Sequence, residues 1–566
     1  MQQLGIRGRR AAHIRRRRLL TRLAPVAGLV VVAFVVGIVF ALNSGGDETQ
    51  IVQRYVTDWQ RGDYARMYAL LDERSQRATS ERAFVAAYQR AAAIATLITL
   101  RHVKVGGVSG QVVPVSLTAR TRVFGAVHAT LEVPFTTSGS GTHVRFAGTL
   151  LFPGLRPGER LRRQVSLAPR AAILARDGTP LAQGADRSSP IPGVAAEIAG
   201  KLGPIAPADA KTYASYGYPH DAKVGLNGLE RIFELQLAGT PGGTLFAGSR
   251  VLARSTPTAG ASVTTTIDPP IESAATAAMG SNLAGVVAMD PRNGQLLALS
   301  GIAFSAPQPP GSTMKIITAT GALEAGIVTL QSTFPIQTSS TIDGYTLQNA
   351  GGEACGGTFL NAFAVSCNSV FAPLGAKLGA ARLVNVAERF GFNQPPQFPG
   401  QAESVIPPAS QLTSSLDVGS SAIGQGKVLS TPLGMTVAGA TIAMGGRRPI
   451  PTLSLHDSPR FAPVTSRTVA SEVQRMMVAV VQSGTGTAAQ IPNVQVAGKT
   501  GTAELRNTAA PGASAAANTD AWFVGYAPVG TPRIVVGALF PNQGAGGATA
   551  APAVHDVLVA ALAQRY

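Results

Sequence analysis

Apolar residues recur at helical spacing in the part of the chain that begins near residue 47. Residues 51–59 and 64–71 each present one apolar face, and a third segment of this kind begins at the polar pair Ser80-Glu81. From residue 103 to residue 152 the pattern changes to short runs rich in valine and threonine. Helices followed by strands predict an α+β unit, which we place at residues 47–155.

Two motifs organise the next segment, which we place at residues 160–260. The run RAAILARDGTPLA (170–182) predicts a strand, a turn at Asp177-Gly178 and a second strand. The run GLNGLERIFELQLAGTPGG (225–243) predicts one helix, capped by Asn227. Proline–glycine pairs between residues 153 and 158 separate this segment from the first unit.

The remaining residues, 264–566, combine buried strands with helices. The run GVVAMDPRNGQLLALSG (285–301) predicts a hairpin with its turn at residues 290–294. The runs VQVAGKTGTAE, AWFVGYAP and RIVVGALF predict three more strands near the end, and an apolar helix is expected from Ala553. Between the hairpin and these strands we expect a long, mainly helical insert.

Charge changes the picture at the N-terminus. The net charge is +18, eight arginines lie in residues 1–22, and no acid precedes Asp47. Such a basic arm could bind nucleic acid, but residues 23–42 carry no charge, and about 20 apolar residues span a bilayer. We therefore expect a cytoplasmic tail (1–22), a retained transmembrane anchor (23–42) and no nucleic-acid partner, with the rest of the chain outside the cytoplasm on a single-pass cell-membrane protein. Cleavage as a signal peptide is the alternative, although the apolar run is longer than such peptides usually have.

The two cysteines, Cys355 and Cys367, leave two alternatives open. Outside the cytoplasm they could form a disulfide, or they could remain half-buried thiols, and their spacing does not decide between the two. They do not form a metal-ligand set with histidine, and no HExxH run is present. We expect neither a metal nor a cofactor.

The run QPPGSTMKII (308–317) places a serine three residues before a lysine among apolar neighbours. On a helix the side chains of Ser312 and Lys315 would share one face. A poorly hydrated lysine has a lowered pKa and can remove the proton of a serine hydroxyl, which is otherwise a weak nucleophile. The pair alone is a weak signal, because an exposed serine beside a solvated lysine is common.

Two further runs bear polar groups suited to acyl transfer. Ser366-Cys367-Asn368 offers a hydroxyl and an amide that could pass on a proton and hold a peptide. Lys499-Thr500-Gly501-Thr502, on a predicted strand, offers a cation and hydroxyls for a carboxylate, and its glycine would let a substrate backbone come close. Each run alone could equally be an ordinary helix turn or strand end.

Together these runs resemble the transpeptidase domain of a class B penicillin-binding protein. The resemblance lies in GSTMK, SCN and KTGTAE, with AIGQGKVLSTPLGM (422–435) and DAWFVGYAP (520–528). The runs at 170–182 and GLNGLE resemble that family's pedestal, or dimerisation, domain. The unit at 47–155 resembles, in pattern only, the nuclear-transport-factor-two-like cone of methicillin-resistance-type penicillin-binding proteins. The implied fold is multidomain α+β, with an antiparallel five-stranded sheet flanked by helices in the transpeptidase domain.

The resemblance also implies the chemistry. Ser312 would attack the penultimate D-alanyl carbonyl of a peptidoglycan stem peptide, Lys315 would take its proton, and D-alanine would leave. An amine of a neighbouring strand would then resolve the acyl-enzyme, and β-lactams would acylate the same serine. Two alternatives remain: a D,D-carboxypeptidase or β-lactamase with water as acceptor, and a catalytically idle scaffold of the division or elongation machinery.

The remaining roles follow from the same resemblance. Ser366 and Asn368 would relay protons and orient both the lysine base and the substrate amide. Lys499 and Thr500 would bind the terminal carboxylate, with Thr502 assisting and Gly501 between them. No run resembles a glycosyltransferase domain, so glycan polymerisation would come from a partner protein.

Overall fold

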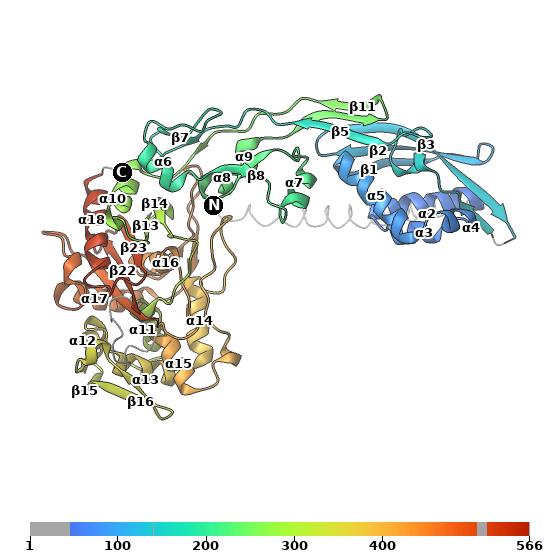
Figure 1. Ribbon diagram of the computed structural model, residues 1–566. Coiled ribbons are helices and arrows are strands. Elements are labelled where there is room, and N and C mark those ends of the chain that lie inside the picture. The colour runs from blue at the N-terminus through green and yellow to red at the C-terminus, as the bar shows by residue number, and fades with distance from the viewer. Residues whose placement is uncertain (1–45, 140, 506–517, 565–566) are drawn as a thin grey trace, which may run out of the picture. The chain divides into compact units, whose positions relative to one another are not determined.

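The computed structural model describes residues 46–139, 141–505 and 518–564. The chain divides into two compact units (Figure 1). The first contains the described residues of Met1–Ala168 with Ile205–Ala222 and Thr240–Thr258, and the second contains the others. Among the described residues, no helix has the length and apolar character needed to cross a bilayer. The predicted tail and anchor, residues 1–22 and 23–42, lie outside the described residues and stay predictions.

Helices followed by an antiparallel sheet make up most of the first unit, as predicted. The elements are α2 (Asp47–Arg61), α3 (Tyr64–Ala69), α4 (Glu73–Ala78), α5 (Glu81–Ala95), β1 (Leu97–Val105), β2 (Val112–Thr121), β3 (Ala126–Ser138), β4 (Gly141–Val144) and the 3-10 turn η1 (Gly148–Leu151). Asp63, Asp72 and Ser80 cap α3, α4 and α5, each accepting a hydrogen bond from the backbone N–H three residues on. The apolar faces of α2 and α5 pack with the sheet in one core. The resemblance of this body to a cone domain stays a prediction.

Segment 160–260 contributes to both units. In the first unit lie α7 (Ala210–Tyr216) and a three-stranded sheet of β5 (Leu161–Ser166), β10 (Gly242–Ala247) and β11 (Arg250–Ser255). In the second lie β6 (Ile173–Leu174), β7 (Pro180–Ala182), α6 (Pro192–Ile198), β8 (Leu202–Pro204), β9 (Lys223–Gly225), α8 (Gly228–Ile232) and α9 (Glu234–Ala238). The strand–turn–strand predicted at 170–182 is confirmed by the antiparallel pairing of β6 with β7. The predicted domain boundaries stay predictions.

The single helix predicted within residues 225–243 is wrong. Two short helices, α8 and α9, occupy the segment, and the backbone leaves helical geometry between them at Phe233 (φ −103°, ψ 18°). Asn227 does stand at the N-cap position of α8, as predicted, but its side chain makes no capping hydrogen bond, and its Oδ1 accepts from the backbone N–H of Lys201 at 2.9 Å instead. A tertiary contact has therefore taken the side chain that the local pattern assigned to the helix.

A five-stranded antiparallel sheet is the centre of the second unit, as predicted (Figure 1). Its strands, in sheet order, are β14 (Gln295–Gly301), β13 (Gly285–Asp290), β23 (Ile534–Phe540), β22 (Thr519–Ala527) and β21 (Ala497–Glu504). Both faces of the sheet are buried. Val286 and Ala288 lie in the core shared with α10 (Pro269–Met279) and α18 (Ala550–Ala563), whereas Val287 and Met289 lie in the core on the opposite face.

The insert predicted to be mainly helical supplies the opposite face. Its helices are α11 (Lys315–Glu324), α12 (Phe359–Ala364), α13 (Asn368–Leu378), α14 (Ala380–Phe390), α15 (Ser415–Ala422), α16 (Pro432–Ala443) and α17 (Arg467–Ser483), with 3-10 turns η2 (Gly311–Met314), η3 (Ala350–Gly352), η4 (Ala409–Gln411) and η5 (Thr487–Ala489). Short strands accompany them: β15 (Thr333–Gln337), β16 (Ser339–Ile342), β17 (Tyr345–Gln348), β18 (Cys355–Thr358), β19 (Arg447–Pro449) and β20 (Phe461–Pro463). Strand β12 (Val263–Thr264) precedes the hairpin and pairs with β6. Edge strand β21 lies beside η2, so two of the three sequence motifs meet at this edge of the sheet.

Candidate active site

Ser312 lies on the 3-10 turn η2 rather than on an α-helix, and α11 begins at Lys315. The turn is held from both sides. The backbone N–H of Gly311 donates to the carbonyl of Gly424 at 3.0 Å, and a Cβ at Gly311 would lie 2.8 Å from the carbonyl oxygen of Thr502. Gly311 also has a positive φ of 51°, which favours glycine. The local structure thus presents the serine on a constrained turn at the start of a buried helix.

Lys315 is fully buried, as the apolar pattern around it predicted. Its Nζ donates to the carbonyl oxygen of Ser366 and to Oδ1 of Asn368, each at 2.7 Å, and more weakly to Oγ of Ser366 at 3.3 Å. Burial, and then the charge of Lys499, hold the pKa of the Lys315 amine well below its usual range. A neutral amine at this position can accept a proton.

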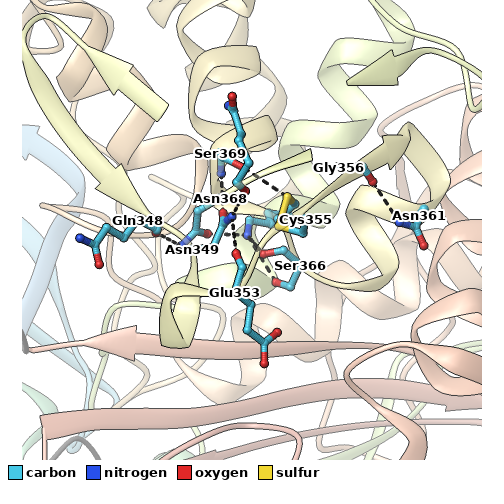
Figure 2. The surroundings of a disulfide bond; sticks show 12 residues. Gln348, Asn349, Glu353, Cys355, Gly356, Asn361, Ser366, Asn368 and Ser369 are labelled. Carbon is cyan, nitrogen blue, oxygen red and sulfur yellow. Dashed lines mark hydrogen bonds between the residues drawn. A yellow bond between two sulfur atoms is a disulfide. The ribbon is translucent and has the colours of Figure 1, made fainter. Parts of the chain in front are cut away.

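The second motif forms a strained turn between α12 and α13. Ser366 has a φ of +61°, which non-glycine residues adopt rarely and which recurs at functional sites. The next residue, Cys367, forms a disulfide with Cys355, so the two cysteines are paired (Figure 2). Asn368 is the first residue of α13. Its Oδ1 accepts a hydrogen bond from Nζ of Lys315, and its Nδ2 donates to the carbonyl of Gln348 at 3.1 Å.

Lys499 enters the same cluster from edge strand β21. Its Nζ donates to Oγ of Ser366 at 2.9 Å and to the carbonyl oxygen of Thr500 at 3.0 Å. Burial lowers the pKa of its amine to about 7. The Ser366 hydroxyl therefore lies between two buried amines, one of which can protonate it while the other accepts its proton. This geometry suits a proton relay.

The rest of the third motif lies along the same strand. The hydroxyl of Thr500 is 2.5 Å from that of Thr485, and the hydroxyl of Thr502 accepts a hydrogen bond from the backbone N–H of Gly546 at 3.3 Å. A Cβ at Gly501 would lie 2.8 Å from the carbonyl oxygen of Pro310, so this glycine lets β21 approach the turn that carries the serine. That Gly501 also makes room for a substrate backbone stays a prediction.

Sequence reasoning missed three residues of this cluster. The rings of Phe371 and Phe363 lie 5.5 Å from the Nζ atoms of Lys315 and Lys499, respectively. The third, Thr485, precedes the strand and also donates its backbone N–H to the carbonyl of Ala364, at 3.1 Å. The apolar residues on both sides of SCN carried a signal for the rings, whereas a threonine in a glycine-rich turn carried none.

The three motifs therefore converge, which sequence spacing alone could not establish. In the described part of the chain, the hydrogen bonds of Lys315 Nζ go to the second motif and none goes to the Ser312 hydroxyl. Catalytic hydrogen bonds are often long before substrate binds, so the serine–lysine transfer remains compatible with this geometry. No group of three potential metal ligands occurs among the described residues.

Comparison with protein families finds two matching regions. Residues 284–559 match the penicillin-binding protein transpeptidase domain, and residues 182–251 match the penicillin-binding protein dimerisation domain. Among curated proteins, a peptidoglycan D,D-transpeptidase of Mycobacterium tuberculosis, PbpA, is 33% identical over 374 residues, covering 54% of this chain and 73% of its own length. The peptidoglycan D,D-transpeptidase MrdA of Acinetobacter baumannii is 26% identical, covering 63% of each chain.

Solved structures give the same result. The ceftriaxone acyl-enzyme complex of penicillin-binding protein A from M. tuberculosis has a TM-score of 0.57 at 27% identity and covers 70% of this chain and 98% of its own. The D,D-transpeptidase domain of a peptidoglycan glycosyltransferase from Eggerthella lenta has a TM-score of 0.58 at 28% identity, with 70% and 99% covered. With the convergent serine–lysine, Ser-Cys-Asn and Lys-Thr-Gly motifs, these similarities show that the chain belongs to the class B penicillin-binding proteins.

Proposed function

We propose that this protein is a serine-type peptidoglycan D,D-transpeptidase that cross-links stem peptides and is acylated by β-lactams. The observation that carries the proposal is the pair of fully buried lysines, Lys315 and Lys499, joined through the Ser366 hydroxyl. Among the described residues, no carboxylate forms an ion pair with either lysine. Their pKa values are therefore lowered without compensation, which suits proton transfer at neutral pH.

The reaction has two stages, acylation of Ser312 and transfer of the acyl group to an amine. Oγ of Ser312 bonds to the penultimate D-alanyl carbonyl carbon, and its proton passes to the neutral amine of Lys315. The amide C–N bond breaks, and the proton passes through Ser366 to the nitrogen of the departing D-alanine. An acceptor amine of a second stem peptide then attacks the ester, forms a new amide and restores the serine hydroxyl.

The other residues bind and orient. The carboxamide of Asn368 holds Lys315 and contacts the substrate amide, while Lys499, Thr500 and Thr502 bind the terminal carboxylate. The backbone N–H groups of Ser312 and Thr502 stabilise the developing oxyanion, and such a donor contributes about 2.7–4 kcal/mol in acyl transfer.

The setting belongs to the same proposal. Residues 23–42 anchor the protein in the cell membrane, with the catalytic unit outside the cytoplasm, because the uncharged run follows eight arginines in the first 22 residues. The helix–strand body at residues 47–155 is a cone-like domain, and a partner glycosyltransferase supplies the glycan strands.

The test uses the full-length protein in detergent with glycan strands that carry pentapeptide stems. We expect cross-linked dimers and an equal amount of free D-alanine, both measured by mass spectrometry and both absent with Ser312→Ala. Tetrapeptide without dimers would indicate that water is the acceptor, which is the carboxypeptidase alternative. Absence of both products and of penicillin labelling, in a folded protein, would support the non-catalytic scaffold.

A further inference from the structure

Helix α13 begins at Asn368, two residues after Ser366 of the proposed proton relay. The residue at its N-cap position provides no capping side chain. Its N-cap residue is Cys367, which is held in the disulfide and makes no capping hydrogen bond. An N-cap side chain usually accepts a hydrogen bond from the N–H of the second or third helical residue. The first helical residue here is Asn368, which binds Lys315, so the position of this helix end matters to the site.

The missing cap comes from Asn349, which lies in a separate segment. Its Oδ1 accepts a hydrogen bond from the backbone N–H of Ser369, the second residue of α13, at 2.8 Å. Its Nδ2 donates to the carbonyls of Gln337 at 2.8 Å and Glu353 at 2.9 Å. Asn349 is only 5% exposed. All the donor and acceptor groups of this carboxamide are therefore engaged in a buried setting, where an unpaired group is costly.

Two neighbouring contacts connect the same segments. Gln348 accepts from Nδ2 of Asn368 through its carbonyl, and Cys355 is bonded to Cys367 (Figure 2). Three consecutive residues of the second motif region, 367–369, are thus each tied to the segment 348–355. A disulfide restrains mainly the distance between two Cα atoms, whereas the bond from Asn349 to a helical N–H also restrains where the helix begins and points.

We propose that Asn349 is a positioning residue for catalysis: it caps α13 from outside the helix and so holds Asn368 and the Ser366 carbonyl against Lys315. The inference rests on the proposed function. The two N–H donors of Asn349 suffice to stabilise the segment 337–353. The hydrogen bond accepted by its oxygen adds nothing within that segment and acts on the helix that carries Asn368.

The test measures acylation of the full-length protein by fluorescent penicillin, per folded molecule, with its pH profile and thermal midpoint. With Asn349→Ala we expect the acylation rate constant to fall about tenfold. We also expect its acid limb to move to lower pH, because the Lys315 ammonium loses well-placed acceptors. The other groups facing that ammonium are the Lys499 amine and the Phe371 ring, which the variant leaves unchanged.

Asn393 provides the matched control. Its carboxamide also bridges backbone groups, accepting from the N–H of Ile406 and donating to its carbonyl, both at 3.1 Å, and among the described residues it makes no hydrogen bond to the three motifs. Asn393→Ala should lower the thermal midpoint and leave the acylation rate and its acid limb unchanged. Asn349→Asp keeps the capping oxygen and loses both donors, so it should lower the midpoint while acylating close to the wild-type rate.

The outcomes separate the two proposals. Wild-type acylation by folded Asn349→Ala, or an equal loss in Asn393→Ala, would overturn the positioning role. If Asn349→Ala does not fold, Asn349→Asp decides: a rate near wild type supports the role, and a tenfold loss per folded molecule contradicts it. A wild-type protein that penicillin does not label would count against the proposed function instead.

Discussion

Two clusters in the second unit each hold two cations, half-buried arginines in one and fully buried lysines in the other, and they balance that charge in opposite ways. Arg170 lies 2.6 Å from the carboxylate of Glu230 and 2.8 Å from that of Glu234, and Arg187 lies 2.7 Å from Glu230. In the candidate active site, by contrast, Lys315 and Lys499 contact hydroxyl, amide and carbonyl oxygens and aromatic rings. One cluster pairs charges, and the other offers neutral acceptors only.

The difference separates a structural ion pair from a catalytic base. Burial alone lowers the pKa of Arg170, but the hydrogen bonds and charges of Glu234 and Glu230 outweigh it and raise that pKa above its ordinary value. Neutral acceptors do not offset burial in the same way, so the pKa values of both lysines fall. The same unit therefore keeps Arg170 charged and lets Lys315 and Lys499 exchange protons.

Replacing Lys315 tests the comparison most strongly. We expect Lys315→Met to lower penicillin acylation by about 10⁴-fold, the upper range for loss of a general base. Lys315→Arg should be equally inactive, because a guanidinium stays charged and cannot accept the proton. The measurement is the acylation rate constant, with thermal melting to establish folding. An arginine variant that retained more than a few per cent of activity would mean that the cation binds substrate and does not act as the base.

The arginine cluster should respond in stability instead. Glu230→Gln leaves two arginines partly uncompensated, so we expect a loss of about 3–5 kcal/mol in unfolding free energy. Acylation per folded molecule should not change. Denaturant melts measure stability, and active-site titration measures acylation. The control is Glu388→Gln, at a half-buried site: among the described residues its carboxylate accepts a side-chain hydrogen bond from Asn393 alone, at 3.3 Å. If Glu230→Gln lost acylation activity but kept its stability, the arginine cluster would contribute to catalysis as well as to folding.

The disulfide stabilises the catalytic cluster without adding charge. It closes a short loop, with 12 residues of sequence separation. Replacing both cysteines by serine should therefore cost about 3 kcal/mol of unfolding free energy in the chain-entropy description. Asn349 remains in place in that variant, so acylation per folded molecule should fall less than in Asn349→Ala. A larger fall would assign the positioning of Asn368 to the disulfide.

The smallest effect concerns pH. Lys499 has a pKa of about 7 in the folded protein, whereas a lysine in the unfolded chain has a pKa of about 10.4. Between these two pH values the folded state therefore binds fewer protons than the unfolded state. Its burial penalty is therefore full below pH 7 and declines as pH rises from about 7 to 10, so stability increases across that window. Lys499→Met should flatten this slope between pH 7 and 9, as followed by urea melts. Equal slopes in the two proteins would mean that Lys499 keeps an ordinary pKa.

The sequence predicted what depends on local pattern and on whole motifs. Strands β13, β14, β22 and β23 follow from alternating or continuous apolar runs, and burial of Lys315 follows from its apolar neighbours. It did not predict contacts between distant segments. The pattern marked Asn227 as a cap, but its oxygen binds Lys201, and it gave no sign that Asn349 would cap a helix 19 residues later.

The same limit applies to the site. The pattern SCN identified Ser366 and Asn368, but the positive φ of the serine and the pairing of Cys367 depend on tertiary packing. Thr485 is found only because α17 ends beside β21, which brings its hydroxyl to that of Thr500. Motifs therefore identified the groups that react, whereas the groups that orient them required the structure.

The most direct test of the account is to map the residue that penicillin acylates. Full-length protein, labelled and digested, should yield one modified peptide, with the added mass on Ser312. Ser312→Ala should melt like the wild type and take up no label, and wild-type labelling should slow as pH falls and Lys315 becomes protonated. A stable adduct on any other residue, or labelling that persists in Ser312→Ala, would contradict the assignment of Ser312 and Lys315 as nucleophile and base.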